Sequence, residues 1–357
     1  MDKIKVGITQ GDTNGVGYEV ILKAFEDPTM LELCTPVIYG SPKIATFHRK
    51  ALGLNVSFTT VSSASQVQDG RVNLVDVVPE EVKIDLGHES AEAGKAALLS
   101  LEAAVADCKQ GLVDVLVTAP INKHSIQSEL FHFPGHTEYL ESCLGEGHKA
   151  MMVLMYEGLR VVLLTTHLPL SDVAGSVTEE AILEKLQAIH AMLGRDFGIS
   201  MPRTAVLSLN PHAGDQGLLG REEQEGIIPA IKKAEEQGML VWGPYPSDGF
   251  FGNGSYRHFD AILAMYHDQG LAPFKTLAMD GGVNYTAGLP VVRTSPDHGT
   301  AYDIAGKNQA SPNSFIQAVY AAIDIYRHRK EYDASRANPL PKLYVDKRED
   351  GRGRNIE

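Results

Sequence analysis

Cysteine is scarce in this sequence. Three cysteines occur among 357 residues (Cys34, Cys108 and Cys143), and no two of them have the CxxC spacing. An odd number of widely spaced cysteines argues against a disulfide framework. We therefore expect reduced thiols and a cytoplasmic location. The chain also begins without the apolar region or cleavage site of a signal peptide.

Basic residues are in the minority as well. The chain has 32 Lys and Arg against 45 Asp and Glu, a formal net charge of -13. Nucleic acids and anionic membranes are bound by clustered positive charge, so we expect neither as a partner. A small phosphorylated ligand remains possible because it needs only a few local donors. No apolar run reaches the roughly 18 residues of a membrane span.

What the sequence does have is an alternation of strand-like and helix-like segments. Its composition, 43% hydrophobic and 22% charged, is that of a globular protein, and its length is enough for two domains. The clearest helix is Glu89–Gln110, which has apolar residues at helical spacing. It is followed by the buried strand DVLVT at 114–118. This alternation predicts an α/β fold with a mainly parallel sheet.

Three segments depart from that pattern. The apolar runs 151–156 and 159–165 are joined by Glu157-Gly158, which predicts a hairpin at an antiparallel edge or an oligomer contact. Residues 241–252, rich in Pro and Gly, are expected to form a loop. The paired carboxylates at 222–223 and 235–236 are interpreted as solvated helix faces.

Three histidines occupy equivalent places at the ends of strand-like runs. His167 follows VVLLTT, His212 follows AVLSLNP, and His267 follows AILAMY. If the strands share one parallel sheet, the imidazoles lie along its C-terminal edge, where three of them suit Zn²⁺ and leave a position open for substrate. The alternative is coincidence, since thirteen histidines are scattered over the chain and the gaps between these three are long.

Other polar residues are ambiguous in isolation. Lys275, Asn284 and Arg293 lie between Gly and Pro turns and suit a phosphate or carboxylate, but a surface loop can hold such residues without function. His136-Thr137 at a helix start is either a cap or a pair of phosphate donors. The loop at 11–17 opens a helix but does not match GxGxxG, so a tight turn is favoured over a dinucleotide site.

Together these segments resemble a known family. The stretches TQGDTNGVGYEV, TAPINKHSI, FPGHTEYL, THLPLSDV, LNPHAGD, MYHDQGLAPFK and GGVNYTAGLPVVRTSPDHGTAYDIAG are similar to those of the 4-hydroxythreonine-4-phosphate dehydrogenases of pyridoxal phosphate biosynthesis. The resemblance extends in order over about residues 4 to 325. Two blocks carry it most specifically, HDQGL and RTSPDHGTA.

The resemblance implies a reaction and a fold. The enzyme would oxidise a small phosphorylated hydroxy acid, 4-hydroxythreonine 4-phosphate, with NAD or NADP and one divalent metal (Zn, Mg or Co) per active site. The 3-keto acid would decarboxylate to 3-amino-2-oxopropyl phosphate. The implied fold is two-domain α/β/α, like isocitrate and isopropylmalate dehydrogenases, with an active-site cleft between domains. We expect domains at roughly 1–135 plus 300–330 and 136–299, a C-terminal appendage at 331–357, and a homodimer with shared active sites.

The resemblance also assigns roles by position. The metal ligands would be His167, His212 and His267, and the substrate contacts would be His136, Thr137, Lys275, Asn284 and Arg293. A base must take the hydroxyl proton, and we favour Lys275 over Asp268 or Asp248. No motif identifies the residues that contact NAD.

The chain departs from the family pattern at Thr13, at Tyr18 and at Asp248-Gly249. These departures leave the ligand set intact but open the choice of substrate, because similar enzymes oxidise 4-phosphothreonate, 4-phosphoerythronate or an aromatic cis-dihydrodiol carboxylate. A different class is also open. A metal-dependent hydrolase or aldolase would use the same three histidines to activate water, and a binding protein would hold the metabolite without turnover.

Overall fold

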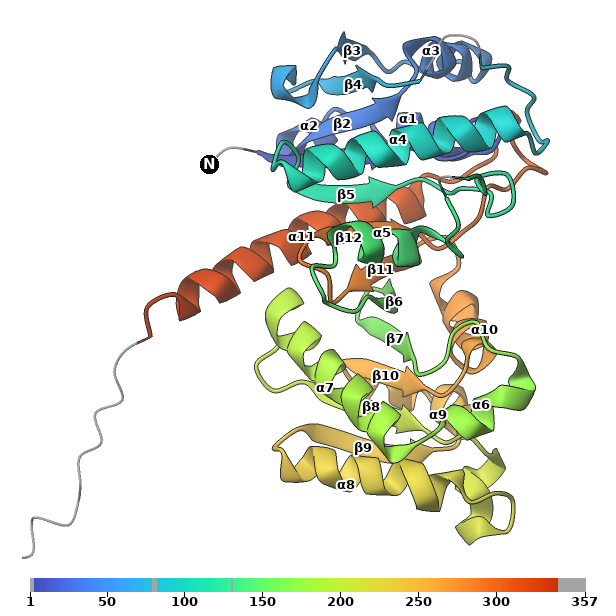
Figure 1. Ribbon diagram of the computed structural model, residues 1–357, viewed down its shortest axis with the longest axis vertical. Coiled ribbons are helices and arrows are strands. Elements are labelled where there is room, and N and C mark those ends of the chain that lie inside the picture. The colour runs from blue at the N-terminus through green and yellow to red at the C-terminus, as the bar shows by residue number, and fades with distance from the viewer. Residues whose placement is uncertain (1–2, 79–81, 130, 340–357) are drawn as a thin grey trace, which may run out of the picture.

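The structure is a computed structural model that describes residues 3–78, 82–129 and 131–339 (Figure 1). The first half of the chain contains β1 (Ile4–Thr9), α1 (Gly17–Ala24), α2 (Met30–Leu33), β2 (Cys34–Gly40), α3 (Pro42–Ala51), β3 (Phe58–Val61), β4 (Val72–Asp76), α4 (Ala91–Lys109), β5 (Val115–Thr118), α5 (His136–Leu144), β6 (Met151–Tyr156) and β7 (Leu159–Leu163). The second half contains α6 (Leu170–Ser176), α7 (Glu179–Asp196), β8 (Arg203–Leu207), α8 (Ile228–Glu236), β9 (Leu240–Tyr245), α9 (Ser247–Gly252), β10 (Ala261–Ala264), α10 (His267–Ala278), β11 (Val283–Ala287), β12 (Val292–Pro296) and α11 (Asn313–Arg336).

Among the described residues, twelve strands form one sheet in the order β3-β4-β2-β1-β5-β12-β11-β6-β7-β10-β8-β9. The strands from β3 to β12 are parallel, as are those from β7 to β9. Between these two groups, β11 and β6 are antiparallel to each other and to the strands that flank them. The predicted α/β fold with a mainly parallel sheet is therefore confirmed.

Helices cover both faces of the sheet, so two apolar layers form on each half (Figure 1). In the first half α4 packs on one face with its alanines and leucines, and α1, α3 and α11 pack on the other. In the second half α7 and α8 lie on one face and α10 on the other. Because helices cover both faces of the sheet, both faces of each strand are buried. This explains why the strands consist of uninterrupted runs of apolar residues.

The predicted hairpin forms, but its expected place at an edge of the sheet was wrong, and the alternative of an oligomer contact stays a prediction. Strands β6 and β7 are antiparallel, with Val153 opposite Val162. They lie in the interior of the sheet because β11 pairs with the other side of β6, with Thr286 opposite Met152. The segments β11 and β12 are more than a hundred residues away in sequence, so local patterning could not reveal this pairing.

Two further expectations need correction. Residues 241–252 are not a loop, since β9 and α9 occupy them. Strand β9 can contain Pro244 because it lies at the edge of the sheet, where a missing N–H leaves no partner unsatisfied. Glu223 is not solvated but buried, with its side chain turned inward in a short π-helix, Glu223–Ile227. Glu235 and Glu236 are exposed as expected.

The single sheet crosses the predicted domain boundary. Strand β12 belongs to the predicted second domain, yet it pairs with β5 of the first. The division into two domains stays a prediction. Residues 331–336 continue α11, and residues 340–357 of the expected appendage lie outside the described part.

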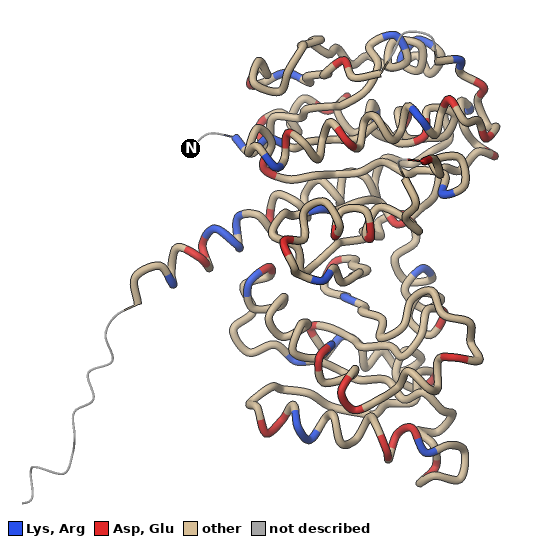
Figure 2. Tube along the Cα trace, in the orientation of Figure 1, with Lys and Arg blue, Asp and Glu red and all other residues tan. Residues whose placement is uncertain are grey.

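Charged residues lie mainly on the helices and loops around the sheet, and the two signs are interspersed over both halves (Figure 2). The strands carry few charges: Lys5, Asp76, Arg160, Arg203 and Arg293. Arg293 is notable among them because β12 lies in the interior of the sheet. No helix in the described residues is long and apolar enough to cross a membrane.

Candidate functional site

A pocket of about 400 Å³ opens over the centre of the sheet. Its floor is formed by side chains of β12, β11 and β6, and α5, α10 and the segment after β5 form its walls. The predicted residues that line it are His136, Thr137, His167, His267, Lys275, Asn284 and Arg293. Three other candidates, His212, Asp248 and Asp268, do not line it.

Strand pairing explains why the floor residues meet. Asn284 of β11 lies opposite Ser295 of β12, and Thr286 lies opposite Arg293. Because side chains alternate between the two faces of a strand, Asn284 and Thr286 point to the same face as Ser295 and Arg293. Eight residues of sequence lie between Asn284 and Arg293, but the ladder makes them diagonal neighbours on one face.

Arg293 is a buried cation whose direct hydrogen-bond partners are all neutral. Its Nε and Nη2 donate hydrogen bonds to Thr118 Oγ1 at 3.1 and 2.6 Å, and its Nη1 donates to Thr286 Oγ1 at 3.0 Å. Burial lowers the pKa of Arg293 to about 10, so it stays charged at neutral pH. Within the described residues no carboxylate lies in ion-pair distance of it. A buried charge held by neutral oxygens alone is costly, and an anionic ligand would compensate it.

Polar atoms around the pocket also lack partners. His136 Nε2, Asn284 Oδ1 and His298 Nε2 are buried and have no hydrogen bond to any described residue. Buried polar atoms are nearly always hydrogen-bonded in native proteins, so three exceptions around one pocket indicate a ligand. Burial, together with the charges of Arg293 and Lys123, holds the pKa of His136 well below its usual range. His136 is therefore a neutral hydrogen-bonding group.

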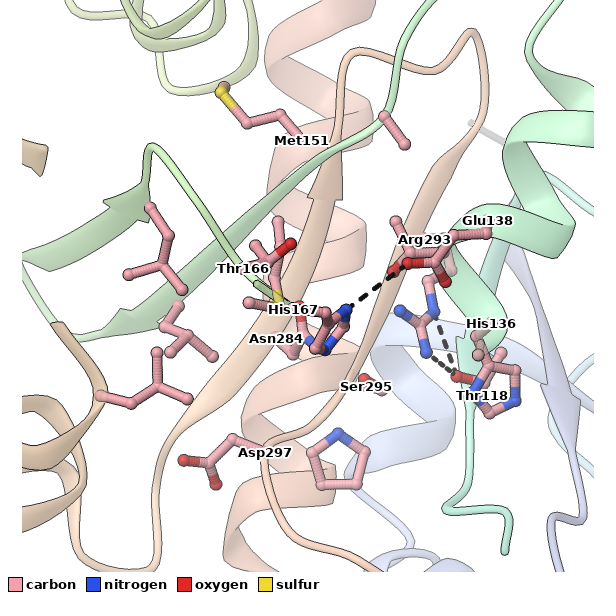
Figure 3. Close-up of a pocket in the computed structure, with 18 of the residues that line it drawn as sticks. Thr118, His136, Glu138, Met151, Thr166, His167, Asn284, Arg293, Ser295 and Asp297 are labelled. Atoms are coloured by element: carbon pink, nitrogen blue, oxygen red, sulfur yellow. Dashed lines mark hydrogen bonds and ion pairs between the residues drawn. The ribbon is translucent and has the colours of Figure 1, made fainter. Parts of the chain in front are cut away.

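Two of the three predicted metal ligands meet at one edge of this pocket. Strands β7 and β10 are parallel neighbours, so His167 and His267 emerge on the same side, with ring centroids 6.5 Å apart. His267 Nδ1 lies 2.7 Å from an oxygen of Asp268, and His167 Nδ1 lies 4.0 Å from Glu138 Oε1 (Figure 3). A carboxylate at Nδ1 is how metal-binding histidines are usually oriented, because it leaves Nε2 free for the metal.

His212 stands apart from that pair. It follows β8, the other parallel neighbour of β10, so its predicted topological place is right. However, the turn Pro211–Gly217 has positive φ at His212, Ala213, Asp215 and Gln216, and this turn leaves His212 exposed and outside the pocket. The described residues of this chain contain no group of three or more His, Cys, Asp or Glu side chains arranged to hold a metal. The described part of one chain thus brings two of the three predicted imidazoles together. Two imidazoles alone do not make the predicted three-histidine metal site.

Among the candidate bases, the pocket contains Lys275 alone. Lys275 lies on α10, and its Nζ is 3.5 Å from the carbonyl oxygen of Asp297. His267, Leu271 and Lys275 recur at four-residue spacing and so share one helix face, all lining the pocket. The carboxylate of Asp268 contacts His267 instead, and Asp248 lies in the first turn of α9.

Several lining residues were not predicted. Thr118 accepts two hydrogen bonds from Arg293, and Glu138 lies one residue after Thr137. The signal for Thr118 was its position at the C-terminal end of the buried strand β5, where α/β proteins place their ligands. Glu138 gave no such signal, since an acidic residue in the first turn of a helix is common.

The fold and the pocket together define an α/β protein with a polar pocket, floored by a buried arginine, at the centre of a mixed sheet. The chain belongs to the family of the pyridoxal phosphate biosynthetic protein PdxA, whose model matches residues 32–322. A 4-hydroxythreonine-4-phosphate dehydrogenase of Bacteroides thetaiotaomicron is 62% identical over 349 residues, which are 98% of this chain and 96% of the relative. This places the chain in a family of oxidoreductases.

A solved structure and a second relative extend the comparison. The crystal structure of 4-hydroxythreonine-4-phosphate dehydrogenase from Klebsiella pneumoniae has a TM-score of 0.78 at 32% identity, covering 91% of this chain and 98% of that one. A D-threonate 4-phosphate dehydrogenase of Cupriavidus necator is 37% identical over 329 residues, 91% of this chain and 98% of the relative. Related members are therefore named for different phosphorylated substrates.

Proposed function

We propose that this chain oxidises 4-hydroxythreonine 4-phosphate with NAD or NADP. The product is a 3-keto acid that loses CO₂ to give 3-amino-2-oxopropyl phosphate, a step toward pyridoxal phosphate. The observation that carries this proposal is Arg293, a buried guanidinium at the floor of the pocket that donates its hydrogen bonds to the neutral hydroxyls of Thr118 and Thr286. The 62% identity to a dehydrogenase of that name supports the choice of reaction.

The pocket is suited to hold an anionic substrate. Arginine has five N–H donors, and Arg293 uses one each on Nε, Nη1 and Nη2. One hydrogen remains on each terminal nitrogen, the arrangement that binds a phosphate or carboxylate through two bonds. Neutral His136, the Asn284 amide and Thr137 would bind the remaining oxygens, and Lys275 adds a second positive charge.

The metal proposal needs a second copy of the chain. We assign one divalent ion (Zn, Mg or Co) to His167 and His267, with His212 supplied by the other subunit of a homodimer. The exposure of His212 supports this, as do exposed apolar side chains beside these histidines: Leu168 (47%), Leu170 (72%), Leu218 (79%) and Leu219 (45%). Such a group of exposed leucines is typical of a protein interface. When bound, the ion would act as a Lewis acid on the substrate hydroxyl oxygen.

The remaining steps fall to the chain and the cofactor. Lys275 is our candidate for the group that accepts the hydroxyl proton, because Asp268 is engaged by His267 and Asp248 lies outside the pocket. The nicotinamide accepts the hydride. A cytoplasmic location is supported by the three cysteines, all of which are free thiols in the structure.

A second substrate is favoured by the relative from Cupriavidus necator. If this chain shared that specificity, 4-phosphothreonate would be the substrate. The deciding experiment measures NADH absorbance when the purified chain is given 4-hydroxythreonine 4-phosphate, 4-phosphothreonate or 4-phosphoerythronate, each with NAD and with NADP. We expect the first compound to give the highest kcat/KM. Product release without NADH formation would instead show a hydrolase or aldolase.

A further inference from the structure

We infer that Glu138 binds the ammonium group of the substrate, so that the pocket selects a phosphorylated amino acid over the corresponding hydroxy acid. This inference rests on the proposed function, because it adds one contact within the same pocket. It also addresses what separates the relatives, which are named for an amino-acid substrate in one case and a hydroxy-acid substrate in the other.

Glu138 lies between the two main features of the pocket. It is in the first turn of α5, directly after Thr137, and its side chain is 39% exposed. Figure 3 shows its carboxylate near the guanidinium of Arg293 on one side and the ring of His167 on the other. The negative charge of Glu138 is close enough to raise the pKa of Arg293 against the effect of burial, yet the two groups form no ion pair. A cation and an anion thus border the same space without neutralising each other.

The carboxylate of Glu138 is also free to accept hydrogen bonds. Within the described residues it accepts none, and His167 Nδ1 lies 4.0 Å from its Oε1, beyond hydrogen-bond distance. The other carboxylates of the pocket are engaged. Glu141 accepts the main-chain N–H of Ala150 at 2.7 Å, and Asp297 Oδ1 accepts from Ser314 Oγ at 3.5 Å. Glu138 is therefore the acidic group that remains available to a ligand.

An α-amino acid matches this arrangement. Its carboxylate and ammonium are attached to the same carbon, so the two charges are separated by only a few ångströms. Arg293 and Glu138 present the complementary pair of charges on the wall of one pocket. A hydroxy acid would place a neutral O–H at Glu138, and a hydrogen bond between a carboxylate and a neutral donor is weaker than one to an ammonium group.

Glu138→Gln tests this, because the amide keeps the shape and removes the charge. We expect kcat/KM for 4-hydroxythreonine 4-phosphate to fall about 10-fold or more, mainly through KM. The affinity for 4-phosphothreonate, measured by titration calorimetry, should change by less than about 3-fold. Glu141→Gln is the matched control on the same helix, and it should leave the ratio of the two affinities unchanged.

The alternative is that Glu138 serves only to orient His167. In that case Glu138→Gln would weaken zinc binding and lower kcat, and would affect both compounds equally; either result would overturn the inference. Calorimetry separates this inference from the proposed function. If the unmodified chain makes no NADH from either compound, the proposed function fails, while the preference of Glu138 for the ammonium compound is still measured by binding.

Discussion

Two hydrogen bonds join Asn210 to Glu223. The main-chain N–H of Asn210 donates to Glu223 Oε1 at 2.7 Å and its side-chain amide donates to Oε2 at 2.9 Å. The main-chain N–H of Leu209 donates to the same carboxylate at 2.9 Å. These bonds hold the start of the turn that contains His212, whose left-handed backbone is unfavourable for residues other than glycine. Glu223 therefore helps to hold the turn that contains His212 in its strained backbone conformation.

We predict that Glu223→Gln lowers the free energy of unfolding by about 1–3 kcal/mol, because a buried carboxylate loses charge-assisted hydrogen bonds. Zinc affinity of the dimer should also fall, since the His212 turn is no longer held. Denaturant unfolding and metal titration measure the two effects. Glu225→Gln is the control, because Glu225 is exposed and its ion-pair partner Arg221 is exposed too. Equal stability of the two variants would contradict the prediction.

Arg293→Lys should raise KM strongly. Lysine carries the charge but cannot donate to Thr118 and Thr286 while also binding an anion through two bonds. We expect kcat/KM to fall about 100-fold or more, as is typical when one partner of a buried charge interaction is lost. Arg327→Lys, at an exposed site on α11, serves as the control in the same steady-state assay. A drop smaller than about 5-fold would show that Arg293 does not bind the substrate.

His212→Ala should abolish turnover and zinc uptake while leaving the fold intact, since His212 is exposed and packs against no core. Dialysis against a chelator should abolish turnover of the unmodified enzyme as well. Circular dichroism and metal analysis check the variant. Near-normal activity in the metal-depleted enzyme would exclude the metal role.

Subunit mixing tests whether the sites are shared. In a dimer formed from one His212→Ala and one His267→Ala subunit, one of the two sites would combine intact ligands. Random exchange makes half of the dimers mixed, so about one quarter of normal activity should return. If every ligand came from the same chain, mixing two inactive variants would restore nothing.

One buried histidine, His48, should make the stability of the fold depend on pH. His48 is buried, with Nε2 at 3.0 Å from the carbonyl oxygen of Thr13, and burial lowers its pKa to about 4. The unfolded chain binds the proton near its ordinary pKa of about 6.5, whereas the folded chain does not. The contribution of His48 to the free energy of unfolding is therefore complete above about pH 6.5. As the pH falls toward 4, the free energy of unfolding loses about 3 kcal/mol through this group.

His48→Gln removes this titration and keeps a donor for Thr13. Its free energy of unfolding should therefore fall less than that of the unmodified chain between pH 7 and about 4. Denaturant melts across that range measure the difference between the two proteins, in which the shared titration of carboxylates cancels. Parallel pH profiles would show that His48 is not responsible.

Much of the site could be read from local patterns. The apolar runs before His167, His212 and His267 predicted parallel strands, and these strands are neighbours in the sheet. The strand end at Thr118 and the helix start at His136 were also visible. These features follow from the periodicity of side chains, which is two residues in a strand and 3.6 in a helix. Because this periodicity involves only a few consecutive residues, it can be recognised in the sequence alone.

The tertiary structure decided what no local pattern contains. Pairing of β11 with β12 and β6 moved the hairpin from an edge to the centre and placed Arg293 beside Asn284. Packing also buried Glu223, whereas the local sequence pattern had predicted a solvated side chain. Such contacts join residues far apart in the chain, and their free energy depends on burial, which the sequence does not display. By itself the sequence determined the strands, the helices and the types of residue at their ends. Only the folded sheet decided which of those residues share a pocket.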